Sequence, residues 1–225
     1  MRIGMFVAVR SAEQPVPADG VPPPLNRIVR PHNQAMSADP PERAEDPAEY
    51  ESARRRFIAR SIWFTIPGTY ALIGAAYAIV PPLPGLGEAS QRLVLAVQWL
   101  LAAIIPYAAV CLVILYMRYA EGAHNPLIGR ESERLKIHCR VMQNTLEQLV
   151  WFALCIVPLA TYLSPAQARL IPILCVFFAV ARFVYWWGYF RNGTLGRALG
   201  VQLTFSLNIP LLLHALVFFA RDLVS

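Results

Sequence analysis

Charged and polar side chains stand at the start of one long apolar segment of this chain. Residues 139–163 read CRVMQNTLEQLVWFALCIVPLATYL, and most of this segment is apolar enough to lie in a lipid bilayer. On a helix that turns 100° per residue, Arg140, Asn144 and Glu147 share one narrow stripe. Charged side chains are unfavourable against lipid, so we expect this stripe to face other helices or a water-filled cavity.

A second stripe follows in residues 181–200, which read ARFVYWWGYFRNGTLGRALG. Arg182, Tyr185 and Tyr189 follow i, i+3, i+7 spacing and share a helix face, and Arg197 comes just beyond them. A guanidinium pairs with a carboxylate through two parallel hydrogen bonds, and a glutamate pairs with an ammonium group. The two stripes together therefore predict a site for a small zwitterion that bears carboxylates.

Two other interpretations of these residues stay open. Arg140, Glu147 and Arg182 could neutralise one another between helices, while the aromatic residues near them form an interfacial belt. A small transporter or channel would also contain charges within its spans, but the chain has no internal repeat of the kind found in many transporters. Since charged residues within spans are usually functional, the combined set favours a binding site.

The elements that must position these residues are membrane-spanning helices. The chain has 225 residues, of which 56% are hydrophobic and only 15% charged, and its mean hydropathy is +0.44. Five apolar runs are long enough to cross a bilayer, at 61–80, 93–117, 141–163, 167–190 and 199–220. The sequence therefore predicts an all-α integral membrane protein that crosses the membrane five times.

The distribution of basic residues predicts how these spans are oriented. Arginines and lysines cluster before the first span, between the second and third, and between the fourth and fifth. The positive-inside rule then places the N-terminus in the cytoplasm, and it accounts for the net charge of +6 without a nucleic-acid partner. Residues 1–50 are rich in proline and predict a disordered tail. Short loops and the absence of sorting signals favour a bacterial inner membrane.

The four cysteines predict neither a disulfide framework nor a metal site. Cys111, Cys139, Cys155 and Cys175 all lie in or at the start of the apolar runs, away from the loops where disulfides are usual. They do not cluster with histidine or carboxylate at the short spacing that metal ligands require. We therefore expect free thiols and no metal.

The two polar segments also carry a resemblance to a known family. Residues 140–148 follow the pattern RxxxNTLEQ and residues 182–189 follow RxxYxxxY, and together they resemble the MAPEG superfamily, the membrane-associated proteins in eicosanoid and glutathione metabolism. The resemblance covers about residues 93–220. It implies a four-helix bundle over 91–225, with residues 51–90 as one extra N-terminal transmembrane helix and its turn. It further implies a homotrimer that binds glutathione between subunits near the cytoplasmic side.

The resemblance also implies roles for single residues. The glutathione peptide would be held by Arg140, Asn144 and Glu147, with Arg182, Tyr185 and Tyr189 from the next subunit and Arg118 from the preceding helix. Arg197 resembles the arginine that stabilises the glutathione thiolate, a role that suits a guanidinium because it lowers the pKa of a nearby thiol. Gly193 and Gly196 predict that Arg197 lies on a flexible turn.

Two functions follow from this resemblance. The first is a membrane glutathione transferase or peroxidase that acts on a lipophilic electrophile or hydroperoxide reaching it from the bilayer. The alternative is a non-catalytic MAPEG-like protein that works as a membrane scaffold or a ligand-binding regulator.

Overall fold

The described residues form four helical elements, the last of which is kinked, and these account for five candidate membrane spans. The structure, a computed structural model, describes residues 47–123 and 131–224. Within them lie α1 (Pro47–Ile79), α2 (Ala89–Ala120), α3 (Glu133–Tyr162) and α4 (Leu170–Val224). The last helix contains two spans, Leu170–Gly193 and Leu195–Val224. The predicted all-α membrane architecture with five spans is confirmed. Residues 1–46, which make up most of the predicted tail, lie outside the described residues.

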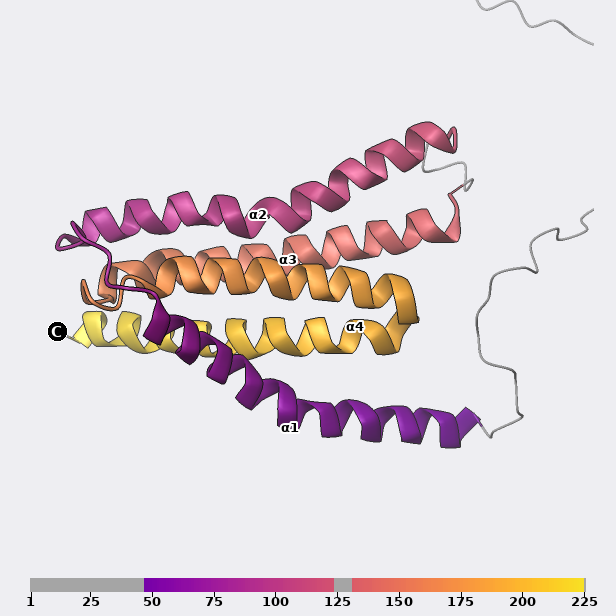
Figure 1. Ribbon diagram of the computed structural model, residues 1–225, viewed down its shortest axis with the longest axis horizontal. Coiled ribbons are helices and arrows are strands. Elements are labelled where there is room, and N and C mark those ends of the chain that lie inside the picture. The colour runs from indigo at the N-terminus through magenta and orange to yellow at the C-terminus, as the bar shows by residue number, and fades with distance from the viewer. Residues whose placement is uncertain (1–46, 124–130, 225) are drawn as a thin grey trace, which may run out of the picture. The chain divides into compact units, whose positions relative to one another are not determined.

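The two spans of α4 are joined by a sharp kink. Asn192 and Gly193 are non-helical, and Gly193 has a φ of 54°. Positive φ is open to glycine because it has no Cβ. Figure 1 shows the chain reversing at this kink, so that the second span runs back beside the first.

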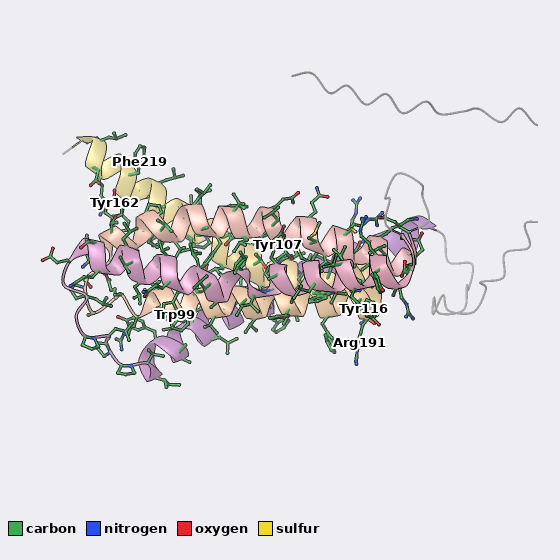
Figure 2. All side chains as sticks on the ribbon, turned by 90° about the horizontal axis from the view of Figure 1, so that it is seen from above. Trp99, Tyr107, Tyr116, Tyr162, Arg191 and Phe219 are labelled. Carbon is green, nitrogen blue, oxygen red and sulfur yellow. The ribbon has the colours of Figure 1, made fainter. Side chains whose placement is uncertain are left out.

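The helices have two distinct ends. Figure 1 shows the start of α1, the end of α2, the start of α3 and the kink of α4 at one end, which we call the kink end. The α1–α2 connection, the α3–α4 connection and the C-terminus lie at the other, which we call the C-terminal end. In Figure 2, Tyr116 and Arg191 mark the kink end, and Tyr162 and Phe219 mark the C-terminal end.

The helices α2, α3 and α4 form a packed bundle, and α1 is added to one side of it. Among the described helices, α1 makes close backbone contacts with α4 alone. Inside the bundle, the rings of Phe152 and Phe178 stack with their centroids 4.6 Å apart, and both side chains are fully buried. Many large apolar side chains point outward instead, as expected for helices whose solvent is lipid.

Candidate ligand site at the kink end

Arg182 lies in the interior, where α3 meets both spans of α4. Its side chain is only 1% exposed. One terminal nitrogen donates to Asn144 Oδ1 at 2.9 Å and to Thr145 Oγ1 at 3.0 Å, and the other donates to Thr204 Oγ1 at 3.4 Å. Its guanidinium also lies 4.1 Å from the centroid of the Tyr185 ring. Arg182 therefore contacts Asn144 within a single chain and fixes the orientation of that amide.

The side chain of Tyr189 lies next to two further arginines, Arg140 and Arg197. This tyrosine is 7% exposed, and the Arg197 guanidinium lies 5.2 Å from its ring centroid. The Arg140 guanidinium interacts with the Tyr189 side chain from α3. Within the described part of the chain, neither arginine forms an ion pair with a carboxylate. Glu133 interacts with Arg140 through its charge without forming an ion pair with it. Two guanidinium groups next to one phenol therefore create a positive region that favours an anion.

The predicted stripe on α3 divides between the interior and the outer surface. Asn144 is half-buried and turns toward Arg182, whereas Arg140 and Glu147 are exposed. Glu147 Oε1 accepts a hydrogen bond of 3.2 Å from Gln143, and no described cation pairs with it. The outer face of a predicted membrane span thus presents a positive and a negative side chain, which is unfavourable unless a ligand or another subunit covers them.

Arg118 occupies a different set of contacts. Its guanidinium forms an ion pair of 2.7 Å with Glu131 and lies 4.0 Å from the sulfur of Cys139. These contacts join the end of α2 to the start of α3, near the kink end. The described contacts of Arg118 therefore do not include Tyr189 or the Arg182 network.

The four cysteines of the chain are free thiols.

Arg197 lies in a helix and not on a flexible turn, so that expectation from the sequence was wrong. A Cβ at Gly196 would overlap the carbonyl oxygen of Gly188, and one at Gly200 would overlap the backbone of Tyr185. These glycines allow the two spans of α4 to approach each other closely and leave no room for a side chain. The close approach holds Arg197 next to Tyr189, while the turn itself consists of Asn192 and Gly193.

Several buried polar residues at this interface were not predicted as site residues. Thr145 and Thr204 bind Arg182, and the Asn208 amide donates to Gln148 Oε1 at 3.0 Å one turn deeper in the bundle. Threonine gives a weak signal in an apolar run because its hydroxyl can bond to its own helix, as Thr204 does with the carbonyl of Gly200 at 2.8 Å. The sequence did contain one signal of this buried polar interface. Gln148 and Asn208 are amide side chains at corresponding depths of two apolar runs.

Comparison with known proteins places most of the bundle in one family. A model of the MAPEG family matches residues 95–217. Transmembrane protein 79 of Mus musculus is 30% identical over 142 residues, which are 63% of this chain and 35% of that protein. Transmembrane protein 79 of Bos taurus is 29% identical over 142 residues, with the same coverage. The chain spans about a third of the length of these curated relatives. No solved structure matches it.

Proposed function

The chain belongs to the MAPEG family of integral membrane proteins, and from this premise we propose that it binds glutathione at the kink end. The proposed activity is that of a membrane glutathione transferase or peroxidase. Its second substrate would be a lipophilic electrophile or hydroperoxide that arrives from the bilayer.

The convergence of Arg140 and Arg197 on Tyr189 is the observation that carries this proposal. Glutathione contains two carboxylates, an ammonium group and a thiol. Guanidinium groups suit its carboxylates and a thiolate, and an exposed carboxylate such as Glu147 suits its ammonium group. Asn144, whose amide is fixed by Arg182, adds a neutral partner for the peptide. The residues present therefore fit the charges of the ligand.

Arg197 would be the catalytic residue. Bound glutathione supplies a thiol that reacts as its thiolate, and a neighbouring guanidinium favours the ionised form. Arg197 is half-buried and held over the Tyr189 ring, so its charge is fixed in place before the ligand binds. A preorganised charge of this kind stabilises an anion without reorganising during the reaction.

We also propose an assembly and an orientation that complete this site. A homotrimer would cover the exposed Arg140 and Glu147 on α3 with neighbouring subunits. The basic residues gathered at the kink end, among them Arg55, Arg60 and Arg191, favour a cytoplasmic location for that end and for the N-terminus. The short loops favour a bacterial inner membrane.

Glutathione binding to the detergent-purified protein, measured by calorimetry, tests the proposed site. We expect Arg140→Ala and Glu147→Ala each to weaken binding by about tenfold or more, because each removes a charge-assisted contact. Arg191→Ala is the matched control, since Arg191 lies at the same end but stacks on Trp187 at 4.5 Å. Equal losses in all three variants, or no binding by the unmodified protein, would refute the site.

The catalytic role needs a separate measurement. We expect Arg197→Ala to abolish most conjugation of a lipophilic electrophile, and most reduction of a lipid hydroperoxide, while glutathione binding largely survives. An unchanged rate in this variant would rule out the role of Arg197 as thiolate stabiliser.

A second candidate is a non-catalytic membrane scaffold or ligand-binding regulator with the same fold. One observation favours it: Asn144, Thr145 and Thr204, from three positions on α3 and α4, accept hydrogen bonds from Arg182. Such a network could serve only to join the helices. If the assembled protein turns over neither class of substrate although it binds glutathione, this second function takes precedence.

A further inference from the structure

The helix α1 precedes the segment that the family model matches, yet it is firmly attached to the bundle. The Gln202 amide on α4 donates to the carbonyl oxygen of Ile58 at 3.2 Å and to Ser61 Oγ at 2.8 Å. Further along, the Tyr70 hydroxyl donates to the backbone carbonyl of Ser206 at 3.1 Å. That carbonyl lacks its helical partner because Pro210, four residues later, has no N–H group.

An apolar groove runs between these two attachments. It has a volume of about 280 Å³ and is lined by Ile62, Ile66 and Tyr70 of α1 and by residues of α4 from Gln202 to Pro210. From Ile62 to Tyr70 a helix rises about 12 Å, which is within the roughly 15 Å of hydrocarbon in one leaflet. The groove is therefore short enough to follow one acyl chain within a single leaflet.

The end of the groove nearest the start of α1 is strongly basic. Arg55, Arg56 and Arg60 are exposed and precede Ile62 on the same helix. Arg55 lies seven residues before Ile62 and so shares its face, about 20° away, whereas Arg56 lies about 120° away. Basic residues that directly adjoin a membrane span attract anionic lipid headgroups. A hydrocarbon groove thus begins beside a cluster of positive charges.

We propose that this groove binds an anionic phospholipid, with the phosphate at Arg55 and one acyl chain between α1 and α4. The two chemistries of the ligand match the two parts of the site: guanidinium groups for the headgroup and apolar side chains for the chain. Neither a free phosphate nor an uncharged lipid would use both parts. The site faces away from Arg197, because Gln202 and Ser206 lie about 140° and 180° from Arg197 around their helix, so it is separate from the proposed glutathione site.

Native mass spectrometry of the full chain, released from nanodiscs of equimolar phosphatidylglycerol and phosphatidylcholine, tests the headgroup. We expect phosphatidylglycerol to be retained in preference to phosphatidylcholine. Arg55→Gln should reduce its retention about fivefold, and the matched control Arg56→Gln less than about twofold. Equal losses in the two variants would indicate a diffuse charge effect and overturn the proposal, as would the absence of any preference between the lipids.

A second pair of variants tests the acyl chain. We expect Ile66→Trp to fill the groove and abolish retention, while Leu72→Trp, at an exposed position of α1 outside the groove, retains the lipid. Thermal unfolding in detergent verifies that both variants fold. Retention by a folded Ile66→Trp variant would overturn the proposal. Displacement of the lipid by excess soluble glycerol phosphate would overturn it as well, since the headgroup alone would then account for binding.

Discussion

The two ends of the bundle use arginine in opposite ways. At the C-terminal end, Arg92 is 7% exposed and donates to four backbone carbonyl oxygens, those of Leu86, Gly87, Ala160 and Thr161, at 2.8 to 3.2 Å. At the kink end, Arg140 and Arg197 interact with the side chain of Tyr189, and neither forms an ion pair with a described carboxylate.

The difference lies in how far the donors of each guanidinium are satisfied. Every nitrogen of Arg92 has a carbonyl partner and four of its five N–H donors are used, so this side chain serves to join the start of α2 to the end of α3. Arg140 and Arg197 face an aromatic ring and its hydroxyl, which neutralise no charge. Arg140 and Arg197 are therefore the arginines whose charge is free to attract an anion, whereas Arg92 joins two helices.

The largest expected change in the free energy of unfolding comes from Arg92→Ala, at the C-terminal end. Four carbonyl groups would lose a charged donor, and we expect the free energy of unfolding to fall by about 3 kcal/mol. Denaturant unfolding in detergent micelles measures the loss. Glutathione binding by the folded fraction should not change, because Arg92 lies at the other end of the bundle. A loss of less than about 1 kcal/mol would contradict the structural role of Arg92.

The next largest effect on stability is expected at the kink end, from a change in the backbone packing and not from its arginines. Gly200→Ala places a Cβ against the backbone of Tyr185, so we expect a loss of about 2 kcal/mol in the free energy of unfolding. Gly74→Ala is the control, because a Cβ there meets no atom within 4 Å. Since alanine favours a helix, the control should be neutral or stabilising by about 0.5–1 kcal/mol. Equal behaviour of the two variants would refute the close packing within α4.

A smaller effect is expected from Tyr189→Phe, which sharpens the comparison within the kink end. The substitution removes the hydroxyl group but keeps the ring beneath Arg197. We expect glutathione affinity to fall by about fivefold, equivalent to about 1 kcal/mol, because Arg140 loses one neutral hydrogen-bonding partner. Calorimetry measures the change. A loss as large as that of Arg140→Ala would mean that the hydroxyl itself contacts the ligand.

The smallest expected effect is that of Arg140→Ala on stability. An exposed guanidinium without an ion pair contributes little to folding, so the free energy of unfolding should change by less than about 0.5 kcal/mol. The same denaturant experiment compares this variant directly with Arg92→Ala. If the two variants were equally destabilised, the distinction between the two ends would be lost.

The five spans could be predicted from the sequence because bilayer thickness sets a minimum length for an apolar run. Their ends could not, since a helix continues beyond the apolar run wherever its side chains are polar but still helix-compatible. The first run begins at residue 61, for example, but α1 begins at Pro47.

The candidate residues could be chosen from the sequence, but which of them are buried and which are exposed could not be predicted. Arg140 and Asn144 differ by only 40° on an ideal helix, and the boundary between packed and exposed surface falls between them. Where that boundary lies depends on which helices pack together. The spacing of polar residues along one helix does not show which helices are its neighbours. The tight contact at Gly200 was missed for the same reason, because it requires knowing that the two spans of α4 face each other.

The kink at Gly193 has a consequence for how the protein responds to membrane thickness. The turn contains only two non-helical residues, so neither span of α4 can slide along its axis without moving the other. Tilting of the helical pair as one hairpin is therefore a direct way to accommodate a thicker or thinner bilayer. Tyr189 and Arg197, which lie on opposite sides of that turn, keep their spacing when the hairpin tilts. Their depth below the headgroups changes together.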